Sequence, residues 1–304
     1  MKASIKITQR KDFITKMDIS MGICYLRKRR GTTEARSMRE CAKITREAGF
    51  RYIDFSGNYY IANDNWRETT EQVLKDFSDF GLTVDQTHAP YVYSGIEENV
   101  YREHMRRSFE LAHMLGAKHI VIHADKYTPD ADGFDFDKAL TAVYDFYAPY
   151  VEYAKKAGLG VAIENLFDNK HGPRTRFTSL VEEQIAIIDK FADPIVSACW
   201  DFGHGKCSYG KDHLEAMRKL GQRLTSTHVH DNHWDIDMHQ NIYFGDCDWE
   251  KAVAYLKEMN YNGKFTYELV YGVLPDALIG RYMKLFYDTA DYLVNDSSGL
   301  PQHQ

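Results

Sequence analysis

Short apolar runs alternate with longer amphipathic stretches along the chain, and this alternation limits the folds that the chain can adopt. Each run has the length and composition of a buried strand. Eight runs have this character: Asp18–Tyr25, Phe50–Phe55, Thr83–His88, His119–His123, Gly160–Asn165, Val196–Asp201, Ser226–His230 and Lys264–Leu269. The intervening stretches place apolar residues at helical spacing, as Met105, Phe109 and Ala112 do in one of them. Strands that alternate with helices favour parallel βαβ units, and eight such units predict a closed (β/α)8 barrel.

A single α/β domain of this type accounts for residues 1–304, with a polar and loose tail from about residue 295. The main alternative is an open, doubly wound sheet. That fold is disfavoured because neither a GxGxxG nor a GxxxxGKS/T phosphate-binding loop follows the first expected strand. Glycines stand before several strands, where helix C-caps are needed: Gly49, Gly81, Gly116, Gly158 and Gly263. We expect helix N-caps at Thr178–Ser179 and at Asp248.

The charge and the distribution of apolar residues exclude several classes of protein. The net charge is −6 with the 13 histidines counted as neutral, so the chain has no general attraction for nucleic acid. No run of about 18 apolar residues is present, and the amino terminus lacks the apolar segment of a secretion signal. The five cysteines show no CxxC spacing and indicate reduced thiols. We therefore expect a cytoplasmic protein without a membrane partner, and a homo-oligomer is compatible with the sequence.

Ionisable side chains gather where the expected strands end. In a (β/α)8 barrel the carboxyl ends of the strands form the active-site face. The third to the eighth strand end in imidazole or carboxyl groups: His88, His123, Glu164, Asp201, His228 with His230, and Glu268. A single histidine or glutamate at such a position is usually a hydrogen-bonded structural group. Carboxylates that converge repel one another, however, and each buried charge needs a partner, so the full set predicts a bound divalent cation.

Four of these groups come from adjacent strands and can meet above the barrel: Glu164, Asp201, His228 and Glu268. Each gap between them corresponds to about one βα unit. Their mixture of oxygen and nitrogen donors suits Mn²⁺, Co²⁺, Zn²⁺ or Mg²⁺. Side chains alternate along a strand, so His228 and His230 point to the same side and the pattern leaves either as the ligand. No cysteine occupies a ligand position, which argues against a closed structural zinc site.

The order of short motifs at these strand ends resembles the xylose-isomerase-like TIM barrel superfamily. That superfamily holds sugar and sugar-phosphate isomerases and epimerases, together with metal-dependent apurinic endonucleases. The resemblance covers nearly the whole chain, and its motifs are THAPY at Thr87–Tyr91, VIH at Val121–His123, IEN at Ile163–Asn165, WDFGH at Trp200–His204, HVHDN at His228–Asn232 and DMHQNIYFGDCDW at Asp237–Trp249. Singly these motifs are weak, but their order along the chain is specific.

The resemblance implies which residues hold the metal and which contact the substrate. It implies Glu164, Asp201, His228 and Glu268 as ligands, with Mn²⁺ expected before Zn²⁺, Co²⁺ or Mg²⁺. His228 is preferred over His230 because the ligand of the family lies three residues before an aspartate, here Asp231. The substrate is expected to be a small carbohydrate. Histidines of the same ring would bind it: His88, His123, His204, His230 and His239.

The activity implied by the resemblance is isomerisation or epimerisation of a sugar. The metal would polarise the sugar carbonyl and stabilise an enediolate. Glu164 and Glu268 would remove and return the proton. A role for both residues as ligands alone stays equally open.

Two other activities remain as alternatives. The endonuclease branch uses a three-metal cluster, and the positions of its extra ligands are occupied here by His88, His123, His204, Asp237 and His239. Against it stand the WDFGH motif in place of Asp-Thr-Cys-His, Tyr243 and Phe244 in a loop that is glycine-rich in that branch, and the negative net charge. A related carbohydrate lyase or dehydratase, or a subunit of a glycoside-cleaving complex, is the third possibility.

The basic segment Arg27-Lys28-Arg29-Arg30 follows the first expected strand, on the active-site side of the barrel. A solvated loop is the usual explanation for such a run. Binding of a phosphate or carboxylate is the alternative.

Overall fold

The computed structural model describes residues 16–91, 96–168, 172–233, 235–270 and 274–295. Its centre is a sheet of eight parallel strands: β1 (Ile19–Gly22), β2 (Tyr52–Ser56), β3 (Thr83–His88), β4 (His119–His123), β5 (Gly160–Glu164), β6 (Val196–Asp201), β7 (Leu224–His228) and β8 (Phe265–Tyr267). All eight expected strands are confirmed. The first is shorter than predicted, because the chain leaves the sheet after Gly22 and forms the 3-10 helix η1 (Cys24–Arg27).

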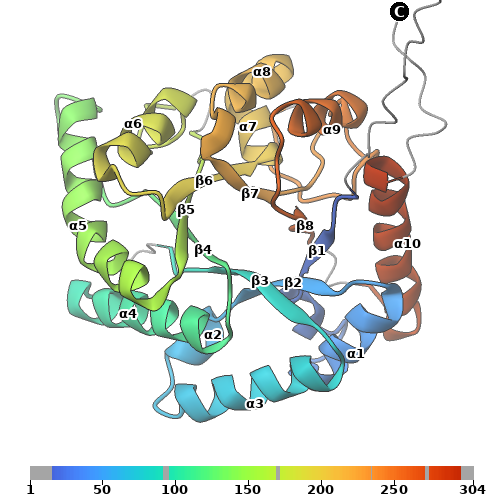
Figure 1. The fold of residues 1–304 in the computed structure, drawn as a ribbon. Coiled ribbons are helices and arrows are strands. Elements are labelled where there is room, and N and C mark those ends of the chain that lie inside the picture. Colours follow the sequence, from blue (N-terminus) through green and yellow to red (C-terminus); the bar gives the residue numbers. More distant parts are fainter. Residues whose placement is uncertain (1–15, 92–95, 169–171, 234, 271–273, 296–304) are drawn as a thin grey trace, which may run out of the picture.

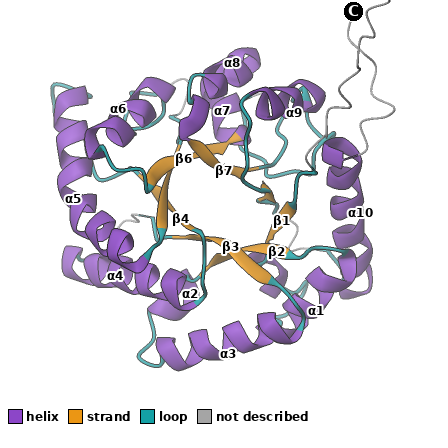
Figure 2. Cartoon of the chain, in the orientation of Figure 1, coloured by secondary structure: helices purple, strands orange, loops and turns teal. Residues whose placement is uncertain are grey.

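The sheet closes on itself. Neighbouring strands pair in the order β7-β6-β5-β4-β3-β2-β1-β8, and the last gap is bridged between β7 and β8. There the Val229 N–H donates to the Thr266 carbonyl at 2.7 Å, and the Glu268 N–H donates to the Val229 carbonyl at 3.1 Å. Figures 1 and 2 show the resulting ring of strands inside a ring of helices. The fold is therefore the predicted (β/α)8 barrel, and the open-sheet alternative is wrong.

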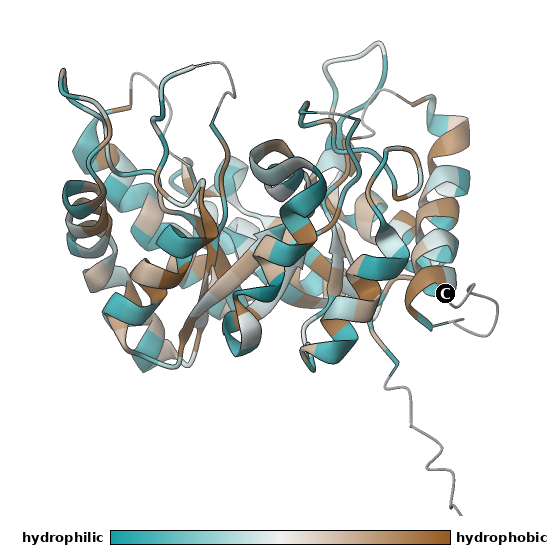
Figure 3. Cartoon of the chain, turned by 90° about the horizontal axis from the view of Figure 1, so that it is seen from above, coloured by the Kyte–Doolittle hydropathy of each residue, from teal (hydrophilic) through white to brown (hydrophobic). Residues whose placement is uncertain are grey.

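The outer ring is made of the helices α1 (Met38–Ala48), α2 (Asn58–Ile61), α3 (Trp66–Asp79), α4 (Glu98–Met114), α5 (Phe136–Ala157), α6 (Val181–Phe191), α7 (Phe202–Tyr209), α8 (His213–Arg218), α9 (Trp249–Glu258) and α10 (Asp276–Asn295), with the short 3-10 helices η2 (Gly210–Asp212) and η3 (Gly221–Arg223). The predicted apolar stripe of α4 is buried, with Met105, Phe109 and Ala112 facing inward. In Figure 3 the helices carry both polar and apolar residues, as expected for helices packed on one side. None of the described helices is long and apolar enough to cross a membrane.

The expected helix boundaries are only partly correct. Four of the five glycines adopt the positive φ of a helix C-cap: Gly49, Gly81, Gly116 and Gly158. The prediction for Gly263 is wrong, because Asn260 takes that conformation after α9 and a Cβ on Gly263 would lie 2.3 Å from the Thr225 carbonyl oxygen. Asp248 caps α9 as predicted, accepting from the Lys251 N–H at 3.0 Å. The N-cap predicted at Thr178–Ser179 is also wrong, since α6 begins after Leu180. The tail predicted from about residue 295 lies outside the described residues, which end at Asn295.

The barrel interior is divided into a small apolar layer and a polar layer above it. Val121, Ala162 and Cys199 pack together as a separate cluster inside the strands. Two positions further along strands β5 and β6, on the same side of the sheet, come Glu164 and Asp201. The small side chains below therefore leave these two carboxylates at the inner mouth of the barrel, at the strand ends.

Asn165 links the ends of β5 and β6 as an additional rung of the sheet. Its Oδ1 accepts from the Asp201 N–H at 2.7 Å, and its Nδ2 donates to the Asp201 carbonyl at 3.0 Å. The side chain is buried, so water does not compete for these bonds. Asn165 thereby fixes the backbone of the residue that carries one of the predicted ligands.

We predict that Asn165→Leu lowers the free energy of unfolding by about 2–4 kcal/mol, because it leaves two buried backbone groups of Asp201 without partners. Asn99→Leu, on the exposed surface of α4, is the matched control and is expected to change it by less than about 0.5 kcal/mol. Urea denaturation of both variants measures the difference. Equal stability of the two variants would show that the rung contributes nothing.

Candidate metal centre

Four ionisable side chains converge where the last four strands end. Glu164, Asp201 and His228 are the last residues of β5, β6 and β7, and Glu268 directly follows β8. One ligand atom from each lies within 4.8 Å of the others. The structure therefore brings together the four residues that the sequence singled out as metal ligands.

The His228 imidazole lies at the centre of this group. Its Nδ1 is 3.2 Å from Glu164 Oε1 and 3.2 Å from Glu268 Oε2, with Asp201 Oδ2 at 3.8 Å. The ring is fully buried, yet neither of its nitrogens has a hydrogen-bond partner among the described residues. A buried imidazole nitrogen without a bond, facing three carboxylates, is the arrangement that a divalent cation completes. The residues present therefore fit a metal ion of this class.

His230 occupies a different place, although it points to the same side of the strand. Its Nε2 lies 3.0 Å from the Asp201 carboxylate, and its ring stacks on His239 with the ring centres 4.0 Å apart. It also packs so closely on α7 that a Cβ on Gly203 would lie 1.8 Å from His230 Cε1. The glycine of the WDFGH motif thus makes room for His230, which in turn holds Asp201.

Glu164 receives more histidine contacts than any other carboxylate of the group. Its Oε2 lies 3.0 Å from His88 Nε2 and 3.2 Å from His123 Nε2. Its Oε1 lies 3.3 Å from His204 Nδ1, in addition to its contact with His228. Burial by itself raises the pKa of Glu164, but electrostatic interaction with the His228 and His123 imidazoles holds this pKa well below its usual value. Glu164 is therefore a carboxylate kept ionised in a buried position.

Asp237 and His239 lie beside this centre, on the loop that follows β7. His239 Nδ1 lies 2.9 Å from the Glu268 carbonyl oxygen, and its Nε2 lies 3.2 Å from Asp237 Oδ2. Burial lowers the pKa of His239, but the contact with Asp237 raises it, to about 9 overall. His230, His239 and Glu268 form a second group in which one ligand atom from each lies within 4.8 Å of the others.

The buried carboxylate of Asp231 fastens this loop to the barrel. It accepts hydrogen bonds from the Trp249 indole N–H at 2.8 Å and from the Cys247 backbone N–H at 3.2 Å. The Asp231 backbone also pairs with Gln240 in both directions. Asp231 therefore positions the segment that carries Asp237 and His239, and this contact explains the tryptophan at the end of the motif.

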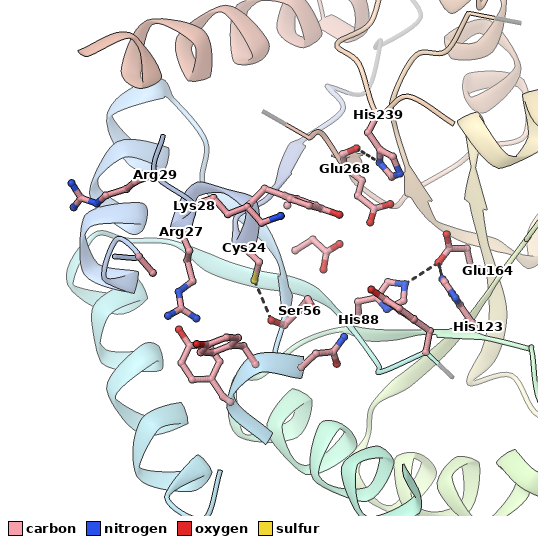
Figure 4. A pocket seen from close by; sticks show the side chains of 18 of the residues that line it. Cys24, Arg27, Lys28, Arg29, Ser56, His88, His123, Glu164, His239 and Glu268 are labelled. Atoms are coloured by element: carbon pink, nitrogen blue, oxygen red, sulfur yellow. Dashed lines mark hydrogen bonds and ion pairs between the residues drawn. The ribbon is translucent and has the colours of Figure 1, made fainter. Parts of the chain in front are cut away.

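A cavity of about 860 Å³ opens over the centre and extends towards the loop after β1. Six of the predicted site residues line it: His88, His123, Glu164, His204, His239 and Glu268. Figure 4 shows five of them around one space, with Glu164 and Glu268 approaching from different strands. His230 is not part of the wall, so its predicted contact with substrate has no support in the geometry, and its position behind Asp201 is that of a supporting residue.

Sequence reasoning missed Asp54, a buried carboxylate on the cavity wall. It belongs to β2, its Oδ2 lies 3.5 Å from His228 Nε2, and its Oδ1 has no hydrogen-bond partner among the described residues. The sequence feature that could have revealed Asp54 is its charge, which interrupts the apolar run of the second strand. It was overlooked because Asp54 stands two positions before the strand end, where an inward side chain still reaches the mouth of the barrel.

The relationship to known proteins follows from the sequence. The profile of the xylose isomerase-like TIM barrel family matches residues 42–287, which is more than half of the chain. The chain belongs to this family. An uncharacterized protein of Sinorhizobium fredii, y4fM, is 23% identical over 269 residues, which cover 76% of this chain and 80% of y4fM.

Solved structures of other proteins share the fold of this family member. A D-tagatose 3-epimerase-like protein has a TM-score of 0.69 at 17% identity, with 92% of this chain and 99% of that protein covered. An IOLI protein with a binding zinc atom has a TM-score of 0.71 at 13% identity, with 93% and 100% covered. At these identities the likeness concerns the fold alone.

We predict that His228→Asn weakens binding of Mn²⁺ or Zn²⁺ by more than 100-fold, whereas His230→Asn, which removes a residue behind a ligand, weakens it by about 10- to 100-fold. Calorimetric titration of the metal-stripped protein measures both affinities. His113→Asn, on the exposed face of α4, is the control and should bind like the unsubstituted protein. A larger loss in His230→Asn than in His228→Asn would reverse the ligand assignment.

Proposed function

We propose that this protein is a divalent-metal-dependent isomerase or epimerase that acts on a sugar or sugar derivative. The observation that carries the proposal is the pair of glutamates on the cavity wall. Glu164 and Glu268 both lie 3.2 Å from His228 Nδ1, but they come from strands separated by β6 and β7. Two carboxylates at one point of a cavity can remove a proton from one position of a substrate and return it at another.

The proposed ligands are Glu164, Asp201, His228 and Glu268, with Mn²⁺ as the first choice of ion and Zn²⁺ as the next. A cation held by these residues would polarise the substrate carbonyl and lower the pKa of the neighbouring C–H group. The zinc in a protein of similar fold supports a divalent ion without fixing its identity.

The two glutamates differ in their freedom to move a proton. Both oxygens of Glu164 are in contact with histidines, and its side chain is only 1% exposed. The Glu268 side chain is 21% exposed and faces the cavity. We therefore assign the proton removal to Glu268, which leaves an enediolate and a protonated Glu268 carboxyl. Glu164, whose carboxylate is held ionised, would return a proton on the other side after it has taken one up from an adjacent imidazolium or from solvent.

The histidines of the cavity wall suit the recognition of hydroxyl groups. His88, His123 and His204 each use one ring nitrogen to contact Glu164. The second ring nitrogen of His88 lies 2.7 Å from the Ala89 carbonyl oxygen, and that of His204 lies 3.6 Å from Asp237 Oδ2. Among the described residues, His123 is therefore the member of this group whose second nitrogen is best placed to donate to or accept from a substrate hydroxyl. The epimerase-like protein of similar fold is consistent with a carbohydrate in this position.

A nuclease is the second candidate, because a specific observation favours it. The group of His230, His239 and Glu268 could hold a further ion beside the first, as a multi-metal phosphodiesterase would need. A carbohydrate lyase is a variant of the first proposal, since the same enediolate can expel a leaving group.

We predict that the manganese-loaded protein incorporates deuterium from heavy water next to the carbonyl of at least one ketose in a panel. Glu268→Gln should slow this exchange by about 10²- to 10⁴-fold, because the amide cannot accept the proton. Glu47→Gln, exposed on α1, is the control and should exchange at the unsubstituted rate. Proton NMR of the recovered sugar measures the exchange, and chelation of the metal should abolish it.

Two results would contradict the proposal. Full exchange by Glu268→Gln would remove this residue from the proton transfer. Nicking of duplex DNA at abasic sites, without exchange into any sugar of the panel, would favour the nuclease.

A further inference from the structure

The cavity over the metal centre has a basic end as well as an acidic one. Arg27 ends η1 and Lys28 follows it, and both side chains line the same cavity as Glu164 and Glu268. Figure 4 shows the Lys28 side chain directed into this space and Arg27 at its edge; Arg29 also lines the cavity, but its guanidinium points away from Lys28. A molecule bound at the metal centre could therefore reach Arg27 and Lys28 with its far end.

The charges of this loop are unequally compensated. Arg29 pairs with Glu40 and with Asp276, each at 2.8 Å, and Arg36 pairs with Asp276. Within the described ranges, no carboxylate lies within 4.0 Å of the Arg27 guanidinium or of the Lys28 ammonium. Two cations on a cavity wall are thus left without acidic partners among the described residues, while Arg29 and Arg36 are neutralised.

The backbone that carries these two cations is held from behind. The Arg36 side chain is only 3% exposed, and its Nη1 donates to the Leu26 carbonyl at 2.6 Å and to the Lys28 carbonyl at 2.8 Å. The partner of its Nη2, Asp276, begins α10 and anchors the contact to the outer ring. The loop is consequently a built part of the barrel, and the positions of Arg27 and Lys28 are fixed at their backbone.

Aromatic rings orient both side chains. The Arg27 guanidinium carbon lies 4.6 Å from the ring centre of Tyr59 and 5.2 Å from that of Tyr60. Lys28 Nζ lies 5.9 Å from the ring centre of Tyr25. Stacking covers the face of a guanidinium and leaves its N–H edge for an anion, and Arg27 Nε is shielded from solvent without a hydrogen-bond partner. Such an edge matches the paired oxygens of a phosphate or carboxylate.

We propose that Arg27 and Lys28 form a binding subsite for an anionic group, a phosphate or a carboxylate, which the substrate carries at the end remote from its reacting carbon. This inference rests on the proposed function, because that function places the reacting carbon at the metal centre. Thr32 and Thr33 line the cavity beside the two cations and supply hydroxyl donors. The exposed carboxylate of Glu34 also lines the cavity, but it lies outside ion-pairing distance of both cations. The acidic and basic ends together would fix the direction in which the substrate enters.

Matched substrates test the subsite through turnover. We would compare deuterium exchange into neutral ketoses, the same ketoses phosphorylated at the terminal carbon, and those oxidised there to a carboxylate. The protein should prefer one anionic series by about tenfold or more in kcat/KM, since charge-assisted bonds to two cations contribute at least that factor. Arg27→Gln and Lys28→Gln should each reduce this preference, mainly through KM, and Arg27→Lys should restore part of it. The preferred series identifies the anion.

Arg30→Gln is the matched control, because Arg30 belongs to the same basic run and is exposed but does not line the cavity. It should retain the preference. Equal kcat/KM for neutral and anionic ketoses, or an equal loss in Arg30→Gln, would overturn the subsite.

Binding of inorganic phosphate tests the subsite without turnover. Calorimetric titration of the metal-loaded protein should show phosphate binding that weakens about tenfold or more in the double variant Arg27→Gln, Lys28→Gln and is unchanged in Arg30→Gln. If no sugar undergoes exchange but this difference is found, the proposed function fails and the subsite stands. If exchange occurs and the double variant binds phosphate as tightly as the unsubstituted protein, the subsite fails and the proposed function stands.

Discussion

The arrangement of the rest of the site depends on the buried carboxylate of Glu164. A charge removed from water must be compensated, and an unpaired buried charge is costly. Here the side chain is 1% exposed and has four imidazoles within 3.3 Å of its oxygens: His88, His123, His204 and His228. These rings come from four different segments of the barrel. Compensation of this one charge therefore brings together side chains from several strand ends, and three of these rings also line the cavity: His88, His123 and His204.

The barrel gives this cluster its order through the alternation of side chains along each strand. Small residues inside the strands, such as Ala162 and Cys199, end the apolar interior two positions before the carboxylates begin. Asn165 then fixes the end of β6, and Asp231 fixes the loop after β7. The ligand positions are thus determined by backbone contacts beneath and behind them. We conclude that the converging acids are a property of the fold, which a divalent cation would neutralise.

The sequence predicts the strands and the strand-end residues well, because both follow from local spacing. The eight strands and the adjacency of Glu164 and Glu268 required no knowledge of side-chain contacts. It predicts poorly whatever depends on tertiary contacts. Thr178 resembles an N-cap in sequence, but its hydroxyl donates to the Glu164 carbonyl instead. His228 and His230 could not be distinguished by alternation, since tertiary contacts separate them: His228 contacts Glu164 and Glu268, whereas His230 packs on Gly203 and His239. The basic run after β1 reads as uniform, whereas folding pairs Arg29 and leaves Arg27 unpaired.

The central claim is that one divalent ion binds where Glu164, Asp201, His228 and Glu268 converge. Anomalous diffraction from crystals soaked in Mn²⁺, recorded near the manganese absorption edge, tests it most directly. The account predicts a strong anomalous peak bonded to Nδ1 of His228 and to the three carboxylates, at metal–oxygen and metal–nitrogen distances of about 2.0–2.3 Å. A peak held instead by His230 and His239, with the site around His228 Nδ1 empty, would contradict it.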